Sequence, residues 1–146
     1  DDRPAFLESR KAAAALGAAN DWNKMEGVAA DSKNVYLAAS NISESMDKAW
    51  GDIHWSTGVK DKAAPGQIAL DKEPCGAVYK GMLTADYDIK RLDPYVVGKF
   101  LGKKKGCDLN GIASPDNILS TATGGLLIAE DAGKRQHPVD FLWLKK

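Results

Sequence analysis

Short apolar runs separated by polar turns dominate the hydrophobic pattern of this chain, and this pattern predicts a mainly β fold. The clearest pair of runs is Ile118–Leu119 and Leu126–Ala129. The segment between them is rich in serine, threonine and glycine, and it contains Gly124 and Gly125. Two adjacent glycines favour a tight turn, so the two runs are predicted to pair as an antiparallel hairpin.

Carboxylates flank this predicted hairpin on both sides. Asp116 precedes the first run, and Glu130 and Asp131 follow the second. Pairing of the runs brings the three carboxylates to the open end of the hairpin. They repel one another there unless a cation lies between them. The alternative is a solvated hairpin end with no ligand.

A second stretch repeats the arrangement and favours the cation. Met25–Asn41 contains an acidic residue, a short apolar run, a polar turn, a second run and an oxygen-bearing pair, and it aligns without a gap onto Pro115–Asp131. Repeats of this kind are typical of propellers and solenoids, in which equivalent positions point to a common axis. Chance similarity between two hairpins is the alternative. The predicted ligands of Ca²⁺ or another hard cation are Glu26, Asn41, Asp116, Glu130 and Asp131.

The remaining pattern predicts one helix, further strands and a long loop. Pro4–Gly17 is alanine-rich, with proline at its start and glycine at its end, and it is expected to pack against a sheet. The runs at 75–82, 87–92 and 95–101 are expected to form another hairpin and its continuation, and 141–144 a last strand. Residues 42–74 lack regular periodicity and are predicted to be a long loop with a possible short strand at 51–55.

These elements predict a single domain, 1–146, built as an arc of a β-propeller with about three hairpin units after one helix. A propeller needs at least four blades to close. An arc leaves strand edges exposed, and such edges are normally covered by other protein, so a partner chain is expected.

Composition and charge exclude some classes of binding partner. Twenty basic and twenty acidic residues cancel, so no bulk charge recruits nucleic acid or an anionic membrane. The chain holds no apolar run long enough for a transmembrane segment and begins without a signal-peptide pattern, which is compatible with prior removal of a leader. Cys75 and Cys107 are the only cysteines and are predicted to form a disulfide, the alternative being two buried thiols. His137 and Asp140 follow the second carboxylate pair and are candidates for supporting it.

Several motifs together resemble the PhoX-type bacterial alkaline phosphatases. They occur in the order found in that family and span nearly the whole chain. They are RPAFLESRKAAAALGA at 3–18, WNKMEGVA at 22–29, VYLAASNISESM at 35–46, CGAVYKG at 75–81, IASPDN at 112–117, and AEDAG followed by H-x-x-D-x-x-W at 129–143.

The resemblance implies a large β-propeller with an iron and calcium cluster that hydrolyses phosphomonoesters outside the cytoplasm. The glutamates of its MEG and AED motifs correspond to Glu26 and Glu130, which the resemblance makes the first metal-ligand candidates. Asp131, Asp116 and Asn41 lie beside them.

The chain also departs from the family pattern. Family members have several hundred residues, and the family's iron-ligating cysteine precedes the MEG motif, where this chain has none. The chain alone is therefore expected not to be a competent phosphatase. Three interpretations remain: a metal-binding segment of a larger phosphatase, a non-catalytic accessory subunit docked in an extracytoplasmic or lumenal assembly, and an isolated Ca²⁺-binding module.

Overall fold

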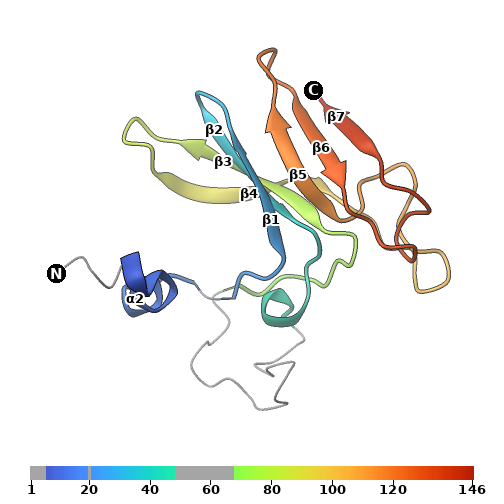
Figure 1. Cartoon of the computed structure of the whole chain (residues 1–146), viewed down its shortest axis with the longest axis horizontal. Coiled ribbons are helices and arrows are strands. Elements are labelled where there is room, and N and C mark those ends of the chain that lie inside the picture. Colours follow the sequence, from blue (N-terminus) through green and yellow to red (C-terminus); the bar gives the residue numbers. More distant parts are fainter. Residues whose placement is uncertain (1–5, 20, 49–67) are drawn as a thin grey trace.

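The computed structural model describes residues 6–19, 21–48 and 68–146, and two antiparallel sheets make up most of it (Figure 1). Both sheets are meanders, in which strands that follow one another along the chain are hydrogen-bonded neighbours. The first sheet contains β1 (Met25–Ala30), β2 (Asn34–Ala39), β3 (Ala77–Leu83) and β4 (Ile89–Val97). The second contains β5 (Pro115–Ser120), β6 (Leu126–Glu130) and β7 (Leu142–Lys145).

The predicted mainly β architecture is confirmed, but its division into units differs from the prediction. The hairpin expected near residues 75–92 does not form a unit of its own. Its first strand, β3, pairs with β2 through Ala39 and Ala77, so it extends the sheet that β1 and β2 begin. The described residues therefore contain two sheets, one of four strands and one of three, where about three hairpin units were expected.

The predicted helix is present but shorter than expected, and its predicted packing against a sheet is wrong. The α-helix α2 (Ser9–Ala15) lies apart from both sheets (Figure 1). Phe6, Leu7 and Leu16 beside it are 85%, 80% and 88% exposed. Its alanine-rich sequence has high helix propensity but offers little apolar area to bury against a sheet. Among the described residues, no helix has the length and apolar character needed to span a membrane.

The main core lies between the two sheets. Alternate residues of β2 and β3 face the second sheet, and alternate residues of β6 face the first, as the period of two in a strand requires. This core contains Tyr36, Ala38, Val78, Ile112, Leu126 and Ile128, with Ile118, Tyr95 and Trp143 packed against it. Burial of these side chains is the main favourable term that holds the two sheets together.

A second core covers the opposite face of the first sheet. Ala39, Ala77 and Tyr79 lie under Ile42 and Met46, which belong to the segment predicted as a long loop. The two ends of this loop are tied together, because Ile42 pairs with Glu73 and Asp47 with Leu70, and a 3-10 helix, η1 (Glu44–Met46), lies between the first members of these pairs. Residues 49–67, including the possible strand at 51–55, lie outside the described residues.

Gly27 on β1 allows the two sheets to approach closely. A Cβ atom at this position would lie 2.0 Å from the backbone oxygen of Asp116 and 3.2 Å from Cγ1 of Ile118. The first of these distances is far below van der Waals contact, and backbone cannot move aside as a flexible side chain can. Only glycine therefore fits between β1 and β5 at this level.

We expect Gly27→Ala to lower the free energy of unfolding by about 2–3 kcal/mol, because the added methyl group forces β1 away from β5. Urea unfolding followed by tryptophan fluorescence measures this loss. Gly124→Ala would be a poor control because Gly124 has a positive φ, whereas Gly111→Ala meets only a backbone oxygen at 3.8 Å and should change stability by less than about 0.5 kcal/mol. Equal stabilities for the Gly27 and Gly111 variants would contradict the close approach.

Candidate functional site

Each of the two repeated hairpins has a β-bulge at its acidic residue. In the β1–β2 pair, Met25 pairs with Ala39 and Gly27 with Ala38, which leaves Glu26 as the extra residue. In the β5–β6 pair, the register is interrupted between Pro115 and Ile118, where Asp116 lies. A bulge bends its strand and redirects a side chain. The repeat predicted from the sequence is therefore a structural repeat, and both bulges occur at the carboxylate.

Two of the predicted ligands, Glu26 and Asp131, lie within electrostatic range of a third, Asp116. Burial raises the pKa of the Asp116 carboxyl above its usual range, and the negative charges of Glu26 and Asp131 raise that pKa further. These carboxylates lie toward the same end of the two hairpins, but among the described residues they do not form a group close enough to hold a metal ion. Their mutual repulsion is the condition that a bound cation would relieve.

Asn41, a fourth predicted ligand, forms a hydrogen bond with a residue close to it in sequence. Its side-chain oxygen accepts a hydrogen bond from the Ser43 hydroxyl. Ser40, the residue before it, donates from its hydroxyl to Glu26 Oε1 at 3.3 Å. The segment after β2 therefore holds Glu26 through a serine, an interaction that the sequence did not indicate.

Glu130 is buried on the inner face of β6, with both carboxylate oxygens hydrogen-bonded. Oε1 accepts from the Ala113 backbone N–H at 2.8 Å and from the Trp143 indole N–H at 2.6 Å. Oε2 accepts from the Phe141 backbone N–H at 3.1 Å and lies 2.9 Å from His137 Nδ1. Four donors occupy the approaches to this carboxylate, which leaves little room for a metal ion.

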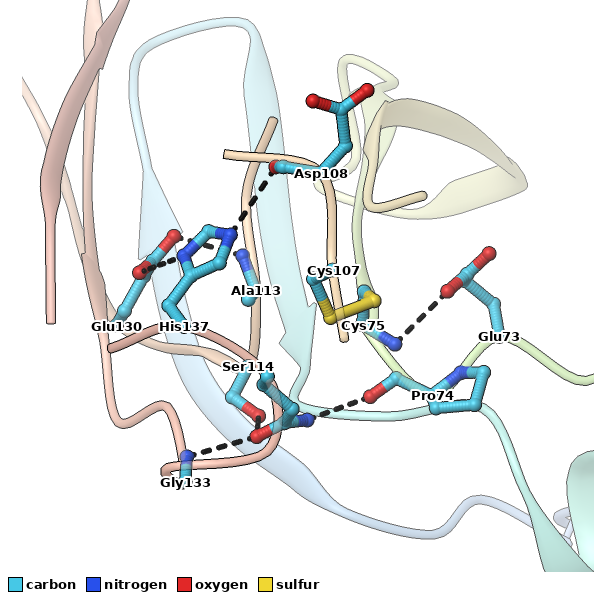
Figure 2. Close-up of a disulfide and its surroundings, with 11 residues drawn as sticks. Glu73, Pro74, Cys75, Cys107, Asp108, Ala113, Ser114, Glu130, Gly133 and His137 are labelled. Atoms are coloured by element: carbon cyan, nitrogen blue, oxygen red, sulfur yellow. Dashed lines mark hydrogen bonds and ion pairs between the residues drawn. A yellow bond between two sulfur atoms is a disulfide. The ribbon is translucent and has the colours of Figure 1, made fainter. Parts of the chain in front are cut away.

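The Nδ1 atom of His137 faces the Glu130 carboxylate in the interior (Figure 2). Neither side chain has exposed surface. The other ring nitrogen, Nε2, lies 3.2 Å from the backbone oxygen of Asp108. Both ring nitrogens therefore lie within hydrogen-bond distance of an oxygen atom. Phe141 packs edge-on against this ring, with 5.3 Å between the ring centroids. His137 was predicted to support the carboxylate pair, and it contacts Glu130 directly.

The gap-free alignment of the two repeats is wrong by one residue in the second strand. Val28 pairs with Leu37, whereas Ile118 pairs with Ile128. The turn between β5 and β6 is therefore one residue longer than the turn between β1 and β2. With the bulges superposed, Glu130 corresponds to Ala39, which is buried on the first sheet. A shift of one residue turns a side chain to the opposite face, and this explains why Glu130 faces the core.

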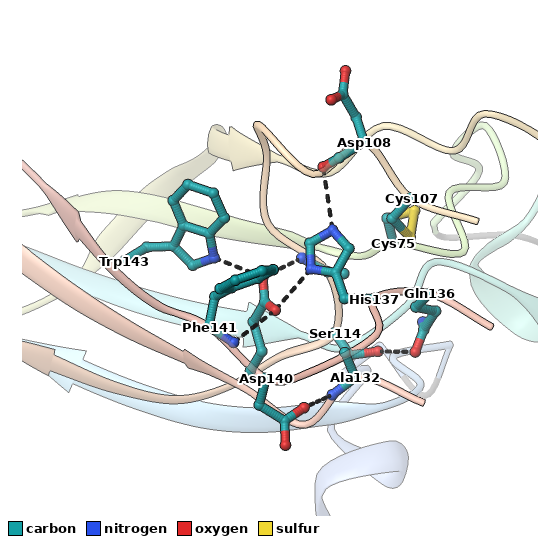
Figure 3. Close-up of polar contacts among 12 residues, drawn as sticks. Cys75, Cys107, Asp108, Ser114, Ala132, Gln136, His137, Asp140, Phe141 and Trp143 are labelled. Atoms are coloured by element: carbon teal, nitrogen blue, oxygen red, sulfur yellow. Dashed lines mark hydrogen bonds and ion pairs between the residues drawn. A yellow bond between two sulfur atoms is a disulfide. The ribbon is translucent and has the colours of Figure 1, made fainter. Parts of the chain in front are cut away.

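A network of polar contacts joins the loops around the predicted disulfide (Figures 2 and 3). The Cys75–Cys107 disulfide is present, with 5.9 Å between the Cα atoms. The Gln136 side chain accepts from the Ser114 hydroxyl at 2.8 Å and donates to the Pro74 backbone oxygen at 2.7 Å. Asp140 accepts from the Ala132 backbone N–H at 2.7 Å, so it orders the loop after Asp131.

A groove of about 540 Å³ lies at the opposite end of the hairpins, between their turns. Asp31 in its wall accepts from the Lys33 backbone N–H at 2.7 Å and from the Tyr36 hydroxyl at 3.0 Å. These hydrogen bonds, the one from Lys33 first, lower the pKa of Asp31 to about 2. The Lys80 ammonium group lies 5.8 Å and 5.3 Å from the Tyr36 and Tyr95 ring centroids. Asp31 thus has its oxygens engaged in holding the β1–β2 turn.

The structure brings the candidates together only in part. In the described portion of the chain, no group of three or more His, Cys, Asp or Glu side chains is arranged closely enough to hold a metal ion. Three residues that matter for the arrangement were not selected from the sequence: Gly27, Gln136 and Trp143. The alternation of Leu126, Ile128 and Glu130 along β6 was a signal that Glu130 lies on the buried face.

Comparisons of the chain with models of protein families, with curated proteins and with solved structures gave no match.

Proposed function

We propose that this chain is a metal-binding segment of a phosphomonoesterase of the PhoX type, active in an extracytoplasmic compartment and only when further protein completes the site. The observation that carries the proposal is the pair of β-bulges that places Glu26 and Asp116 at equivalent positions of the two hairpins. Burial and the neighbouring charges of Glu26 and Asp131 also raise the pKa of the Asp116 carboxyl. Oxygen ligands of this type suit Ca²⁺ and other hard cations. The motif resemblance at the same residues supports the calcium and iron of that family as the metals.

The roles of the candidates differ in this proposal. Glu26, Asp116 and Asp131 would hold the metal, and Asn41, which follows the end of β2, would be a further oxygen ligand. Glu130 and His137 hold the loops that carry Asp131 and the last strand. Bound metal ions would supply polarisation of a phosphoryl oxygen and an activated hydroxide. The chain's own contribution is to fix the carboxylates on two bulges, with the disulfide and Gln136 tying the supporting loops together.

We expect the isolated chain to bind Ca²⁺ weakly, with a dissociation constant of about 10⁻⁴–10⁻³ M, the range of exposed calcium modules. Asp116→Asn should weaken binding at least about 10-fold. Because the pKa of Asp116 is raised, binding should also weaken as the pH falls through that pKa, where the carboxyl takes up a proton. Calorimetric titration with Ca²⁺ at two pH values measures both effects.

Asp86→Asn is the matched control, since Asp86 is exposed in the turn after β3 and should leave binding unchanged. Hydrolysis of p-nitrophenyl phosphate by the calcium- and iron-treated protein, with and without Asp116→Asn, then tests the activity. Wild-type protein that binds no Ca²⁺, or variants of Asp116 and Asp86 that bind equally well, would refute the site.

A non-catalytic accessory role is the second candidate, and two observations favour it. Glu130 already has four hydrogen-bond donors, and the described residues contain no complete metal-binding group. Ca²⁺ binding without hydrolysis, even in the natural assembly, would select this role over the phosphatase.

A further inference from the structure

The outer face of the β5–β6–β7 sheet is apolar and uncovered. Leu119 pairs with Leu127, and Leu127 pairs with Leu144, so the three leucines form one row across the sheet. Leu142 pairs with Ala129 and lies on the same face. Leu119, Leu142 and Leu144 are 61%, 69% and 54% exposed. We call this surface, made by Leu119, Leu127, Ala129, Leu142 and Leu144, the leucine face. A continuous exposed apolar surface of this kind marks an interaction site.

The inner face of the same sheet is already occupied. Ile118, Ile128 and Trp143 pack against the first sheet in the main core. Side chains alternate between faces along each strand, so the leucine face and this inner face are distinct surfaces of one sheet. Anything that covers the leucine face must come from outside the described pair of sheets.

The structural repeat shows that the leucine face is equivalent to the face of the first sheet that contacts the second sheet. When the bulges at Glu26 and Asp116 are superposed, Ala29 corresponds to Leu119. Ala29 faces the second sheet and packs in the main core, and Gly27 beside it contacts Asp116. Leu119 thus lies on the face of β5 that, on β1, makes the contact between sheets. The leucine face of the second sheet is therefore exposed, whereas the equivalent face of the first sheet is buried in the main core.

The complementary surface is also present. It is open along β1, whereas the second core covers the same face of the sheet at Ala39, Ala77 and Tyr79. Val28 corresponds to Ile118, the residue by which the second sheet packs on the first. Val28 is 67% exposed on the other side of β1, with Ala30 exposed beside it. The chain therefore carries at its two ends the two halves of one sheet-on-sheet contact.

We propose that these two surfaces bind each other between copies of this chain, the leucine face of one copy packing against the Val28 side of β1 in the next. The contact repeats the one already made inside each chain. The net charge of zero imposes no general repulsion between copies. The two surfaces differ, so the contact is head-to-tail, and such contacts close into rings when the rotation allows. Propellers of four to eight sheets require about two to four copies of a two-sheet chain.

Sedimentation velocity in EDTA, across protein concentrations, tests this interface independently of metal binding and so of the function proposed above. The wild-type chain is expected to form species of about two to four times the 15.7 kDa chain mass. Leu119→Glu and Val28→Glu should each shift the protein to monomer with unchanged circular dichroism. Leu109→Glu is the control, because Leu109 is 56% exposed but lies outside both sheets.

Mixing the two interface variants provides the decisive measurement. Each variant retains the surface that the other has lost, so the mixture should form a dimer of one copy of each and nothing larger. A symmetric contact would not be rescued in this way. A wild-type monomer at every concentration would overturn the proposal and leave the leucine face to a different protein's sheet, and so would association that survives both substitutions.

Discussion

Replacement of Glu130 by glutamine is expected to lower the free energy of unfolding by about 3–5 kcal/mol, because each buried donor that loses its acceptor costs about 1–3 kcal/mol. The amide would present a donor toward groups that already donate, among them the Trp143 indole and the Ala113 and Phe141 backbone N–H groups. It would also replace the carboxylate that His137 Nδ1 faces at 2.9 Å. Urea unfolding followed by tryptophan fluorescence measures the loss.

The same experiment separates a structural role for Glu130 from metal binding. The loss should be equal with and without EDTA, because the four donors belong to the protein. Asp131→Asn is the matched control: it changes the adjacent carboxylate, which is exposed, and should alter stability by less than about 0.5 kcal/mol in EDTA. A loss in the Glu130 variant that appears only when Ca²⁺ or iron is present would show that Glu130 is a ligand after all.

Removal of the disulfide is expected to cost about 3–4 kcal/mol, the chain-entropy value for a closed loop that spans 32 positions. Both cysteines are buried, so Cys75→Ala with Cys107→Ala avoids placing hydroxyl groups in the core. The urea midpoint of the wild-type protein should fall when dithiothreitol is added. That of the double variant should be low and unaffected by the reductant. Equal midpoints for oxidised and reduced wild-type protein would contradict the prediction.

The sequence allowed the hairpins to be predicted because period-two alternation and glycine turns are local signals. It also allowed the disulfide to be predicted, since the chain has a single pair of cysteines. Whether the Ala-rich helix packs against a sheet was not predictable from such local signals. Helix propensity is a property of the local chain, whereas burial of Phe6 and Leu16 depends on a partner surface that no local pattern describes.

The candidate site was predictable only in part. The positions of Glu26 and Asp116 followed from the repeat, and both occur at bulges. Glu130 was placed wrongly in the repeat because a turn tolerates an extra polar residue with no visible mark in the sequence. The burial of Glu130 depends on donors from Ala113, His137 and Trp143, which lie in three separate segments. Such a convergence can be found only in three dimensions.

The extra residue in the β5–β6 turn has a consequence for how this molecule could have diversified. If the two hairpins descend from a duplicated ancestor, the insertion lies in a solvent-exposed turn, where it disturbs no hydrogen bond of either ladder. It nevertheless shifts the numbering of every later residue in one copy by one relative to the other copy. Counting residues matches Glu130 with Ser40, whereas the strand pairing matches it with the buried Ala39, so ligands cannot be transferred between the two copies by counting.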